Sequence, residues 1–142
     1  NPLAIAVADT VWDIIADKEF LDNVRKISNY LHGKLEKFAA NNTKYIESIT
    51  GRGLMLGIKF RKEYDVSFIT HLSMNELLLS IPASNNVLRL TPPLIITEKH
   101  CDEAMKKLEI VIEKLGKPTS KIKYQVKEGY RAFKRVIGVE KE

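Results

Sequence analysis

The segment around Arg89 constrains the fold more strongly than any other part of the chain. An Asn-Asn pair favours a turn, and residues 87–90 after it form a short apolar run interrupted by one charge, Arg89. Pro92 and Pro93 follow almost at once, and neither has an N–H to donate to a neighbouring strand. The sequence therefore predicts a short strand over residues 87–90 that ends just after an arginine.

The side chains of this strand are predicted to separate by alternation. Leu88 and Leu90 fall on one face, and Val87 and Arg89 fall on the other. If the leucines face the core, the guanidinium group points away from it. An arginine fixed at the end of a strand is suited to bind a carboxylate through two parallel hydrogen bonds. A solvent-exposed or salt-bridged arginine fits the same pattern, so the pattern alone leaves both interpretations open.

A second strand pair is predicted on either side of Gly51-Arg52-Gly53. Residues 54–60 alternate large apolar side chains with Met, Gly and Lys, which is typical of a half-buried strand, and residues 45–50 supply its partner. Two glycines that tolerate positive φ favour a tight hairpin. A glycine-rich loop can also hold a phosphate through its N–H groups. We favour the turn, because no lysine follows at phosphate-loop spacing and no helix begins there.

Hydrophobic periodicity predicts helices elsewhere, and the candidate capping residues Asn1, Asp65 and Thr97 mark where three of them begin. The predicted helices cover residues 3–16, 21–40, 66–75 and 98–115. The first has a narrow polar stripe of Asp9, Asp13 and Asp17 and is apolar elsewhere, so we expect it to need burial on more than one side. The apolar run at residues 77–81 is interpreted as a strand that Pro82 ends, although the pattern of so short a run fits a buried helix equally well.

Charge and cysteine content limit the classes of protein that fit. The net charge of +5 resides in residues 117–142, a basic amphipathic extension. Such a stretch can contact a membrane or nucleic acid, but we favour docking onto its own domain, because a stretch this short carries little charge for a stable anchor. Cys101 is the single cysteine, so no internal disulfide forms, which fits a reducing cytoplasm. No apolar run is long enough to span a membrane.

Three motifs resemble those of one enzyme family. Asn-Val-Leu-Arg-Leu-Thr-Pro-Pro-Leu-Ile-Ile-Thr at residues 86–97 resembles a C-terminal motif of acetylornithine and ornithine aminotransferases, which belong to the class III pyridoxal-phosphate aminotransferases. Gly-Arg-Gly-Leu-Met-Leu-Gly-Ile at residues 51–58 resembles a second motif, and Asn-Pro-Leu-Ala at residues 1–4 resembles the end of a third. They occur in the family's order and together cover residues 1–115.

The resemblance implies a C-terminal small domain over residues 1–116, with a linker helix first. It implies an α/β fold in which a small, mainly antiparallel sheet is packed with helices. Arg89 would then bind a substrate carboxylate, or pair with an acidic residue of the large domain. The complete enzyme would transfer an amino group from N-acetylornithine or ornithine to 2-oxoglutarate in arginine biosynthesis. We expect it to use pyridoxal phosphate, to be cytoplasmic and to form a homo-oligomer such as a dimer.

The resemblance also implies what this chain lacks. The lysine that forms a Schiff base with pyridoxal phosphate, and the acid beside the ring nitrogen, belong to the large domain, and no lysine here matches that position. We therefore expect no catalytic or cofactor-binding residue in this chain, no bound cofactor, and no activity from it alone. The alternative is a free-standing, non-catalytic binding module derived from the same fold.

No metal site is predicted from the sequence. His32, His71 and His100 fall in three separate predicted helices. His100 and Cys101 are adjacent, so on a helix they point about 100° apart, which is poor geometry for one metal ion.

Overall fold

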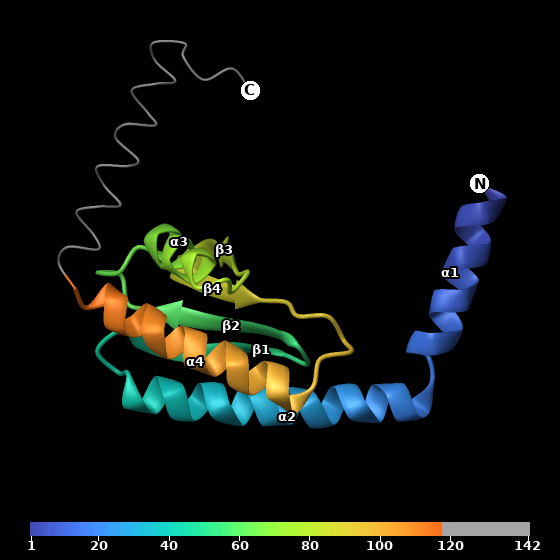
Figure 1. The fold of residues 1–142 in the computed structure, drawn as a ribbon, viewed down its shortest axis with the longest axis horizontal. Coiled ribbons are helices and arrows are strands. Elements are labelled where there is room, and N and C mark those ends of the chain that lie inside the picture. The colour runs from blue at the N-terminus through green and yellow to red at the C-terminus, as the bar shows by residue number, and fades with distance from the viewer. Residues whose placement is uncertain (118–142) are drawn as a thin grey trace, which may run out of the picture.

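The computed structural model describes residues 1–117, which form four α-helices and one four-stranded sheet (Figure 1). The elements in chain order are α1 (Pro2–Ile15), α2 (Lys18–Asn41), β1 (Ile46–Arg52), β2 (Met55–Phe60), α3 (Val66–Asn75), β3 (Ile81–Ala83), the short 3-10 turn η1 (Ser84–Asn86), β4 (Val87–Leu90) and α4 (Glu98–Leu115). The basic extension predicted at residues 117–142 lies outside the described residues from 118 onward.

The sheet has the strand order β1-β2-β4-β3, and each neighbouring pair is antiparallel. This confirms the predicted fold class of a small antiparallel sheet packed with helices. Strand β4 occupies the predicted residues 87–90, and the β1–β2 hairpin turns at Gly53, whose φ is +59°. Ser28 Oγ on α2 donates a hydrogen bond to Gly53 O at 2.7 Å, which ties the hairpin to that helix.

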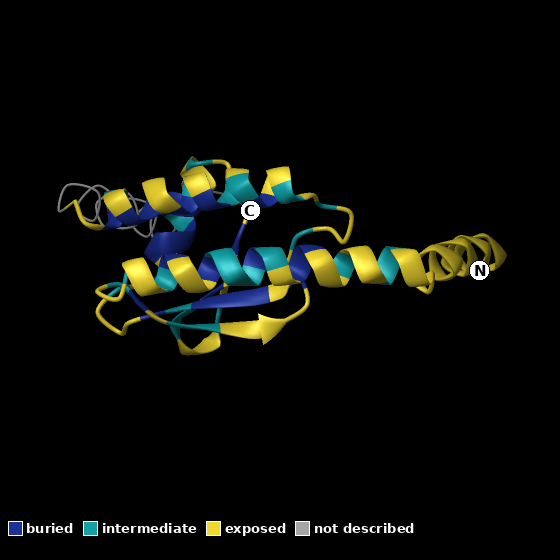
Figure 2. Ribbon diagram, turned by 90° about the horizontal axis from the view of Figure 1, so that it is seen from below, coloured by how far each residue is buried: buried dark blue, intermediate teal, exposed yellow. Residues whose placement is uncertain are grey.

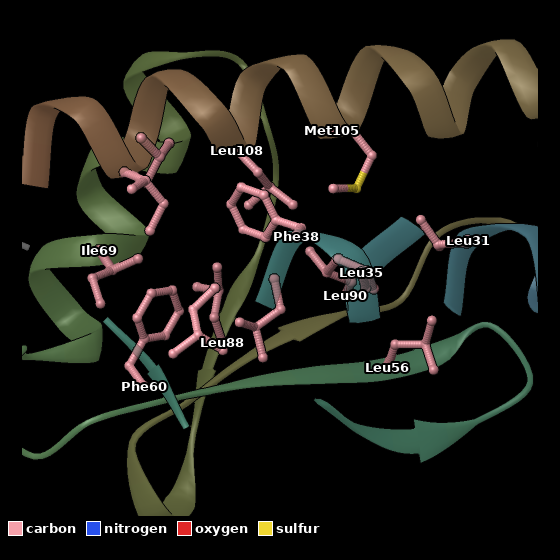
Figure 3. Packing of buried hydrophobic residues seen from close by; sticks show 14 of the residues in the cluster. Leu31, Leu35, Phe38, Leu56, Phe60, Ile69, Leu88, Leu90, Met105 and Leu108 are labelled. Carbon is pink, nitrogen blue, oxygen red and sulfur yellow. The ribbon is translucent and has the colours of Figure 1, made fainter. Parts of the chain in front are cut away.

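The core lies between one face of the sheet, here called the inner face, and helices α2, α3 and α4 (Figure 3). In the hairpin, the alternating residues Leu54, Leu56, Ile58 and Phe60 are all buried, as their spacing predicted. From β4, Leu88 and Leu90 join them. The helices contribute the buried residues Ile27, Leu31, Leu35, Phe38, Val66, Phe68, Ile69, Leu72, Cys101, Met105, Leu108, Val111, Ile112 and Leu115.

The opposite face of the sheet, here called the outer face, is not covered by any helix of residues 1–117 (Figure 2). The side chains that alternation places there are exposed or half-buried, apart from Gly57. They are Ser48, Thr50, Arg52, Met55, Gly57, Lys59, Ile81, Ala83, Val87 and Arg89. The predicted orientation of Arg89, away from the core leucines, is thereby confirmed.

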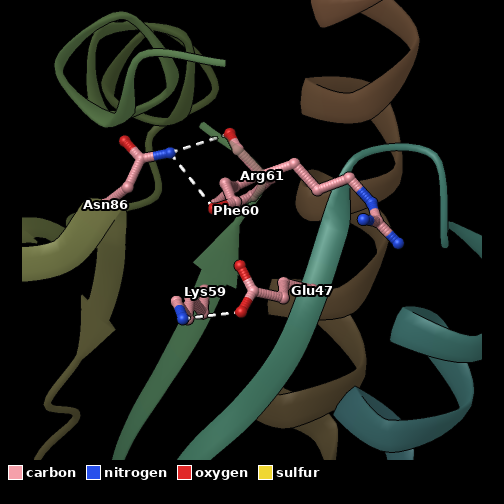
Figure 4. Close-up of polar contacts among 5 residues, drawn as sticks. All are labelled: Glu47, Lys59, Phe60, Arg61 and Asn86. Atoms are coloured by element: carbon pink, nitrogen blue, oxygen red, sulfur yellow. Dashed lines mark hydrogen bonds and ion pairs between the residues drawn. The ribbon is translucent and has the colours of Figure 1, made fainter. Parts of the chain in front are cut away.

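Asn86 connects the end of β2 to the start of α3 (Figure 4). Its Nδ2 amide group lies 3.2 Å from Phe60 O, 2.9 Å from Arg61 O and 2.7 Å from Tyr64 O, and it donates toward these carbonyls. Its Oδ1 accepts a hydrogen bond from Val66 N at 3.0 Å. The residue has φ of +63°, a conformation that asparagine adopts more readily than most residues.

The strand predicted over residues 77–81 is wrong, because the extended segment begins only at Ile81 and continues through Pro82. Leu77 has φ of +57°, which no regular strand accommodates, and its carbonyl accepts a hydrogen bond from Lys107 Nζ at 3.1 Å. Proline is tolerated in β3 because this is an edge strand, where an N–H can face away from the ladder.

Helix α1 extends away from the body of the domain at the N-terminal end of α2 (Figure 1). Every residue of α1 is exposed except Ile15, which is half-buried, and Leu3 and Trp12 keep 75% and 66% of their surface. The burial that its apolar sequence demands is therefore not provided by residues 1–117. Among these residues, no helix is both long enough and apolar enough to cross a membrane.

Candidate functional site

Arg89 occupies the middle of a row of residues that crosses all four strands. The antiparallel register pairs Arg89 with Gly57 on β2 and with Ile81 on β3, and Gly57 in turn pairs with Thr50 on β1. Directly paired residues share a face, so all four lie on the outer face. Because β4 has a hydrogen-bonded neighbour on each side, the backbone of Arg89 is held firmly.

An open hollow of about 460 Å³ lies on the outer face beside Arg89. It is here called the arginine hollow, because Arg52 at the hairpin and Arg89 on β4 both line it. Thr50 and Ser84 contribute hydroxyl groups, and the rest of its lining comes from Gly51, Met55, Leu56, Gly57, Ala83 and Val87. This described lining contains two cations and no carboxylate, so the hollow is suited to an anion.

Gly57 lets the neighbouring strands close tightly beside Arg89. A Cβ atom at this position would lie 2.7 Å from Val87 Cγ1 and 2.9 Å from Thr50 Oγ1, closer than real contacts allow. The φ of Gly57 is not in the left-handed region, so space rather than backbone conformation demands glycine here. The side chains of Val87 and Thr50 therefore occupy the space that a side chain at residue 57 would need.

Neither arginine of the hollow has an ion-pair partner among residues 1–117. Lys59 on the same face does have an ion-pair partner, because its Nζ lies 2.6 Å from Glu47 Oε1 (Figure 4). That hydrogen bond with Lys59 also lowers the pKa of the Glu47 carboxyl below its ordinary value. The positive charge of Lys59 is thus compensated by a neighbour, whereas the described part of the chain offers no such neighbour to Arg52 or Arg89.

A separate polar cluster joins α2 to α4. Tyr30 Oη donates a hydrogen bond to Asp102 Oδ1 at 2.8 Å, and Lys34 Nζ lies 2.9 Å from the same oxygen. The hydrogen bonds from Lys34 and then Tyr30 lower the pKa of the Asp102 carboxyl. The carboxylate in turn raises the pKa of both Lys34 and Tyr30. The cluster lies on α2 and α4, away from the outer face, so we interpret it as a structural contact.

An apolar cavity of about 280 Å³ lies between α4 and the segment that leads into β3. His100 and Cys101 are in its lining, but the Nδ1 of His100 accepts a hydrogen bond from Thr97 N, which caps α4. Burial raises the pKa of the Cys101 thiol, so the thiol stays protonated and unreactive. Residues 1–117 contain no group of three His, Cys, Asp or Glu side chains placed to hold a metal ion.

The family model described as aminotransferase class-III matches residues 1–112. The chain therefore belongs to the class III aminotransferase family.

Its relatives indicate a narrower group within that family. The chain is 36% identical over 109 residues to acetylornithine aminotransferase 1 of Bradyrhizobium diazoefficiens, covering 77% of this chain and 26% of the relative. It is 38% identical over 116 residues to the acetylornithine/succinyldiaminopimelate aminotransferase of Buchnera aphidicola, covering 80% of this chain and 28% of the relative. The chain thus spans little more than a quarter of the length of these relatives.

Solved structures show the same fold. The N-acetylornithine aminotransferase of Stenotrophomonas maltophilia superposes with a TM-score of 0.72 at 31% identity, over 80% of this chain and 31% of that one. The acetylornithine aminotransferase of Elizabethkingia anophelis also gives a TM-score of 0.72, at 29% identity, over 80% of this chain and 29% of that one. The predicted likeness to acetylornithine and ornithine aminotransferases is confirmed.

From the sequence we predicted a binding role for Arg89 but interpreted Arg52 only as part of a glycine turn. The turn is confirmed, yet its arginine shares a hollow with Arg89. The alternation of side chains along a strand could have identified Arg52 from the sequence. Arg52 and Thr50 are two residues apart and so share a face, and the pairing of Thr50 with Gly57 places that face beside Arg89.

Proposed function

We propose that this chain is the C-terminal domain of an acetylornithine aminotransferase-like enzyme. The complete enzyme would transfer an amino group from N-acetylornithine or ornithine to 2-oxoglutarate, as a step of arginine biosynthesis in the cytoplasm. The support is the family match over residues 1–112 together with relatives that carry the acetylornithine aminotransferase name. Because the chain spans about a quarter of those relatives, the activity belongs to the larger protein.

The single observation that carries a role for Arg89 is its position on the open face of the sheet. The guanidinium group faces the arginine hollow, and no carboxylate of residues 1–117 neutralises it. Arginine binds a carboxylate with two parallel hydrogen bonds in a fixed plane, which orients the bound molecule as well as holding it. We assign Arg89 to a substrate carboxylate, or to an acidic residue of the large domain when the substrate changes.

The residues of the arginine hollow do not fit pyridoxal phosphate. This cofactor supplies an electron sink and needs a lysine for its Schiff base and a partner for its ring nitrogen. The described lining of the hollow contains neither a lysine nor an acidic residue. We therefore assign the cofactor to a large domain of the complete enzyme, and we expect residues 1–142 alone neither to bind it nor to catalyse transfer.

Helix α1 has the surface expected of a helix that lies between two domains. Its apolar side chains are exposed here, and a large cofactor-binding domain packed along it would bury them. In the complete enzyme we expect this domain contact and a homo-oligomer, and in the isolated chain we expect self-association through the same helix.

A chimeric enzyme tests the proposal directly. Residues 1–112 would replace the matching quarter of the Bradyrhizobium relative, and amino transfer from N-acetylornithine to 2-oxoglutarate would be measured. We expect an active chimera and a loss of activity of at least tenfold in Arg89→Gln, about the size of a hydrogen-bonded charge pair. Arg25→Gln, which removes an exposed arginine of α2 paired with Asp22, is the matched control and should keep full activity. An active chimera that is indifferent to Arg89→Gln would contradict the assignment of Arg89.

A free-standing binding module remains the second candidate, favoured by the basic residues 117–142 that lie beyond the family match. The reading frame upstream of Asn1 separates the two candidates. Continuation into a cofactor-binding domain supports the enzyme, whereas a start codon directly before Asn1 supports the module.

A further inference from the structure

The apolar cavity between α4 and the segment that leads into β3 is suited to hold apolar side chains. Its volume is about 280 Å³, and an apolar cavity of about 150 Å³ already has room for a benzene ring. The buried residues Leu31 and Leu90 line it from the core side. In its described lining the polar side chains are Thr91 and His100, and His100 Nδ1 already accepts a hydrogen bond from Thr97 N at 3.1 Å. An apolar occupant therefore fits the cavity better than a charged one.

Apolar side chains that residues 1–117 leave in water border the opening of this cavity. Leu79 keeps 83% of its surface and Ile81 keeps 49%, although both line the cavity. The nearby Leu77 is also exposed and has φ of +57°, a conformation that is rare for a bulky residue. The hydrogen bond from Lys107 Nζ to Leu77 O, at 3.1 Å, ties this segment to α4 in its exposed position. An open cavity with an apolar border has the character of a binding surface.

We propose that residues 118–142 of this same chain occupy the apolar cavity, with the aromatic rings of Tyr130 and Phe133 inside it. The sequence predicts that this extension docks onto its own domain, and the cavity gives that docking a location. The inference is independent of the proposed function, since it involves neither Arg89 nor amino transfer.

The extension starts at a place from which it can reach the cavity. One wall of the cavity is formed by residues 100–108 of α4, a helix that ends at Leu115. At about 1.5 Å per residue this wall lies about 10–22 Å back along the helix from its end. Pro118 has no N–H with which to continue the helix, so the chain can turn back after it. Residues 118–125 reach about 26 Å when extended, which brings Val126 to any part of the wall.

The composition of the extension matches a site held by apolar burial. Its apolar residues recur at intervals of three and four, so one face of a helix would carry them together, with the basic residues on the other side. They are Val126, Tyr130, Phe133 and Ile137. The described lining of the cavity contains no carboxylate, so attraction between opposite charges does not select the occupant.

The tether favours this segment over a second copy of the chain. A segment joined to its site by a short linker acts at an effective concentration on the order of millimolar. The apolar face of α1 from another copy has to compete at the concentration of the protein itself. In dilute solution the cavity is therefore filled from within the same chain.

NMR of the full 142-residue chain, labelled at its leucine and isoleucine methyl groups and its aromatic rings, tests the inference. We expect nuclear Overhauser contacts from the rings of Tyr130 and Phe133 to methyl groups of Leu79, Ile81 and Leu108. These contacts should persist in high salt, because apolar burial is not screened by ions. Phe133→Gln should lower the ratio of docked to undocked chain by about tenfold, the low end for burying a phenylalanine side chain, read from the methyl shift of Ile81.

Each side of the contact has a matched control. Lys134→Gln changes the neighbouring residue of the extension and should leave the methyl shifts unchanged. On the cavity side, Leu79→Gln should remove the contacts, whereas Met74→Gln should keep them, because Met74 is an exposed apolar residue of α3 outside the lining. Amide spectra of each variant verify folding.

Three results would overturn the inference. The first is the absence of contacts between the rings and the cavity methyl groups, or their loss in high salt. The second is an equal response to Phe133→Gln and Lys134→Gln. The third is a contact found only between differently labelled copies in a mixed sample, which would place the segment in the cavity of a second copy. Each of these results leaves the proposed function standing.

Discussion

Asn86 Oδ1 accepts a hydrogen bond from the backbone N–H of Val66, the first residue of α3, at 3.0 Å. The amide group of the same side chain donates toward carbonyls at the end of β2 and in the loop beyond it. One side chain thus replaces backbone partners that neither the helix nor the strand provides.

Replacing Asn86 by glycine should lower the free energy of unfolding by about 2 kcal/mol, since glycine keeps the positive φ but leaves several part-buried groups without partners. Asn85→Gly is the matched control, because Asn85 has φ of +60° and no side-chain hydrogen bond to the described residues. It should change stability by less than about 0.5 kcal/mol. Urea denaturation of both variants measures the difference, and equal effects would show that the backbone conformation alone matters.

Two glycines should respond in opposite directions to the same substitution. Gly57→Ala places a methyl group within 3 Å of Val87 and Thr50 and should destabilise the chain by about 1–3 kcal/mol through overpacking. Gly33 lies in α2 with nothing within 4 Å of an added Cβ, so Gly33→Ala should stabilise it by about 0.5–1 kcal/mol. Chemical denaturation gives both values. A stabilised Gly57→Ala variant would contradict the close packing beside Arg89.

Acid should weaken the contact between α2 and α4. The Asp102 carboxyl has a folded-state pKa below its ordinary value of 3.8. Its contribution to the stability of the fold is therefore complete above pH 3.8 and is lost as the pH falls through the folded-state pKa. We expect the melting temperature to fall below about pH 4, and to fall less steeply in Asp102→Asn. Thermal melts from pH 2 to pH 7 measure this slope. Glu47→Gln is the control for acid effects elsewhere, because it removes a carboxyl on the sheet whose pKa is also lowered.

At alkaline pH, the same cluster should make the chain less stable as the pH rises. The pKa values of Lys34 and Tyr30 are raised, so their contribution is complete below the ordinary values of 10.5 and 10.0 and is lost as the pH rises beyond them. Tyr30→Phe should remove the tyrosine part of this dependence. Melts from pH 8 to pH 12 would contradict the prediction if the variant and the parent chain lost stability in parallel.

The exposed apolar surface of α1 should cause the isolated chain to self-associate. Trp12 is the single tryptophan, so its emission should shift to shorter wavelength as the chain is concentrated and the ring becomes buried. Leu3→Gln combined with Trp12→Gln should give a monomer by sedimentation, whereas Thr10→Gln on the same helix should not. A parent chain that stays monomeric at high concentration would contradict this prediction.

Local pattern was sufficient to predict the main elements and the direction of Arg89. The alternation in β2 and β4 identified both core leucines of β4, because strand parity depends only on neighbours in the sequence. The caps at Asn1 and Asp65 were equally local, and both side chains accept a hydrogen bond from the first turn of their helix.

Features that depend on distant residues were not predictable in the same way. The role of Asn86 depends on carbonyls more than 20 residues away in the chain, so the sequence indicated only a turn. The start of β3 was placed too early because apolar Leu77 and Leu79 suggested burial, whereas both are more than 80% exposed. The shared hollow of Arg52 and Arg89 required the strand order, which local pattern does not determine.

The row from Thr50 through Gly57 and Arg89 to Ile81 has a mechanical consequence. Because Arg89 is hydrogen-bonded into a ladder on both sides, its Cα cannot shift unless the whole sheet shifts with it. Displacement of its guanidinium group by more than a change of rotamer must therefore come from rotation of the domain as one rigid body.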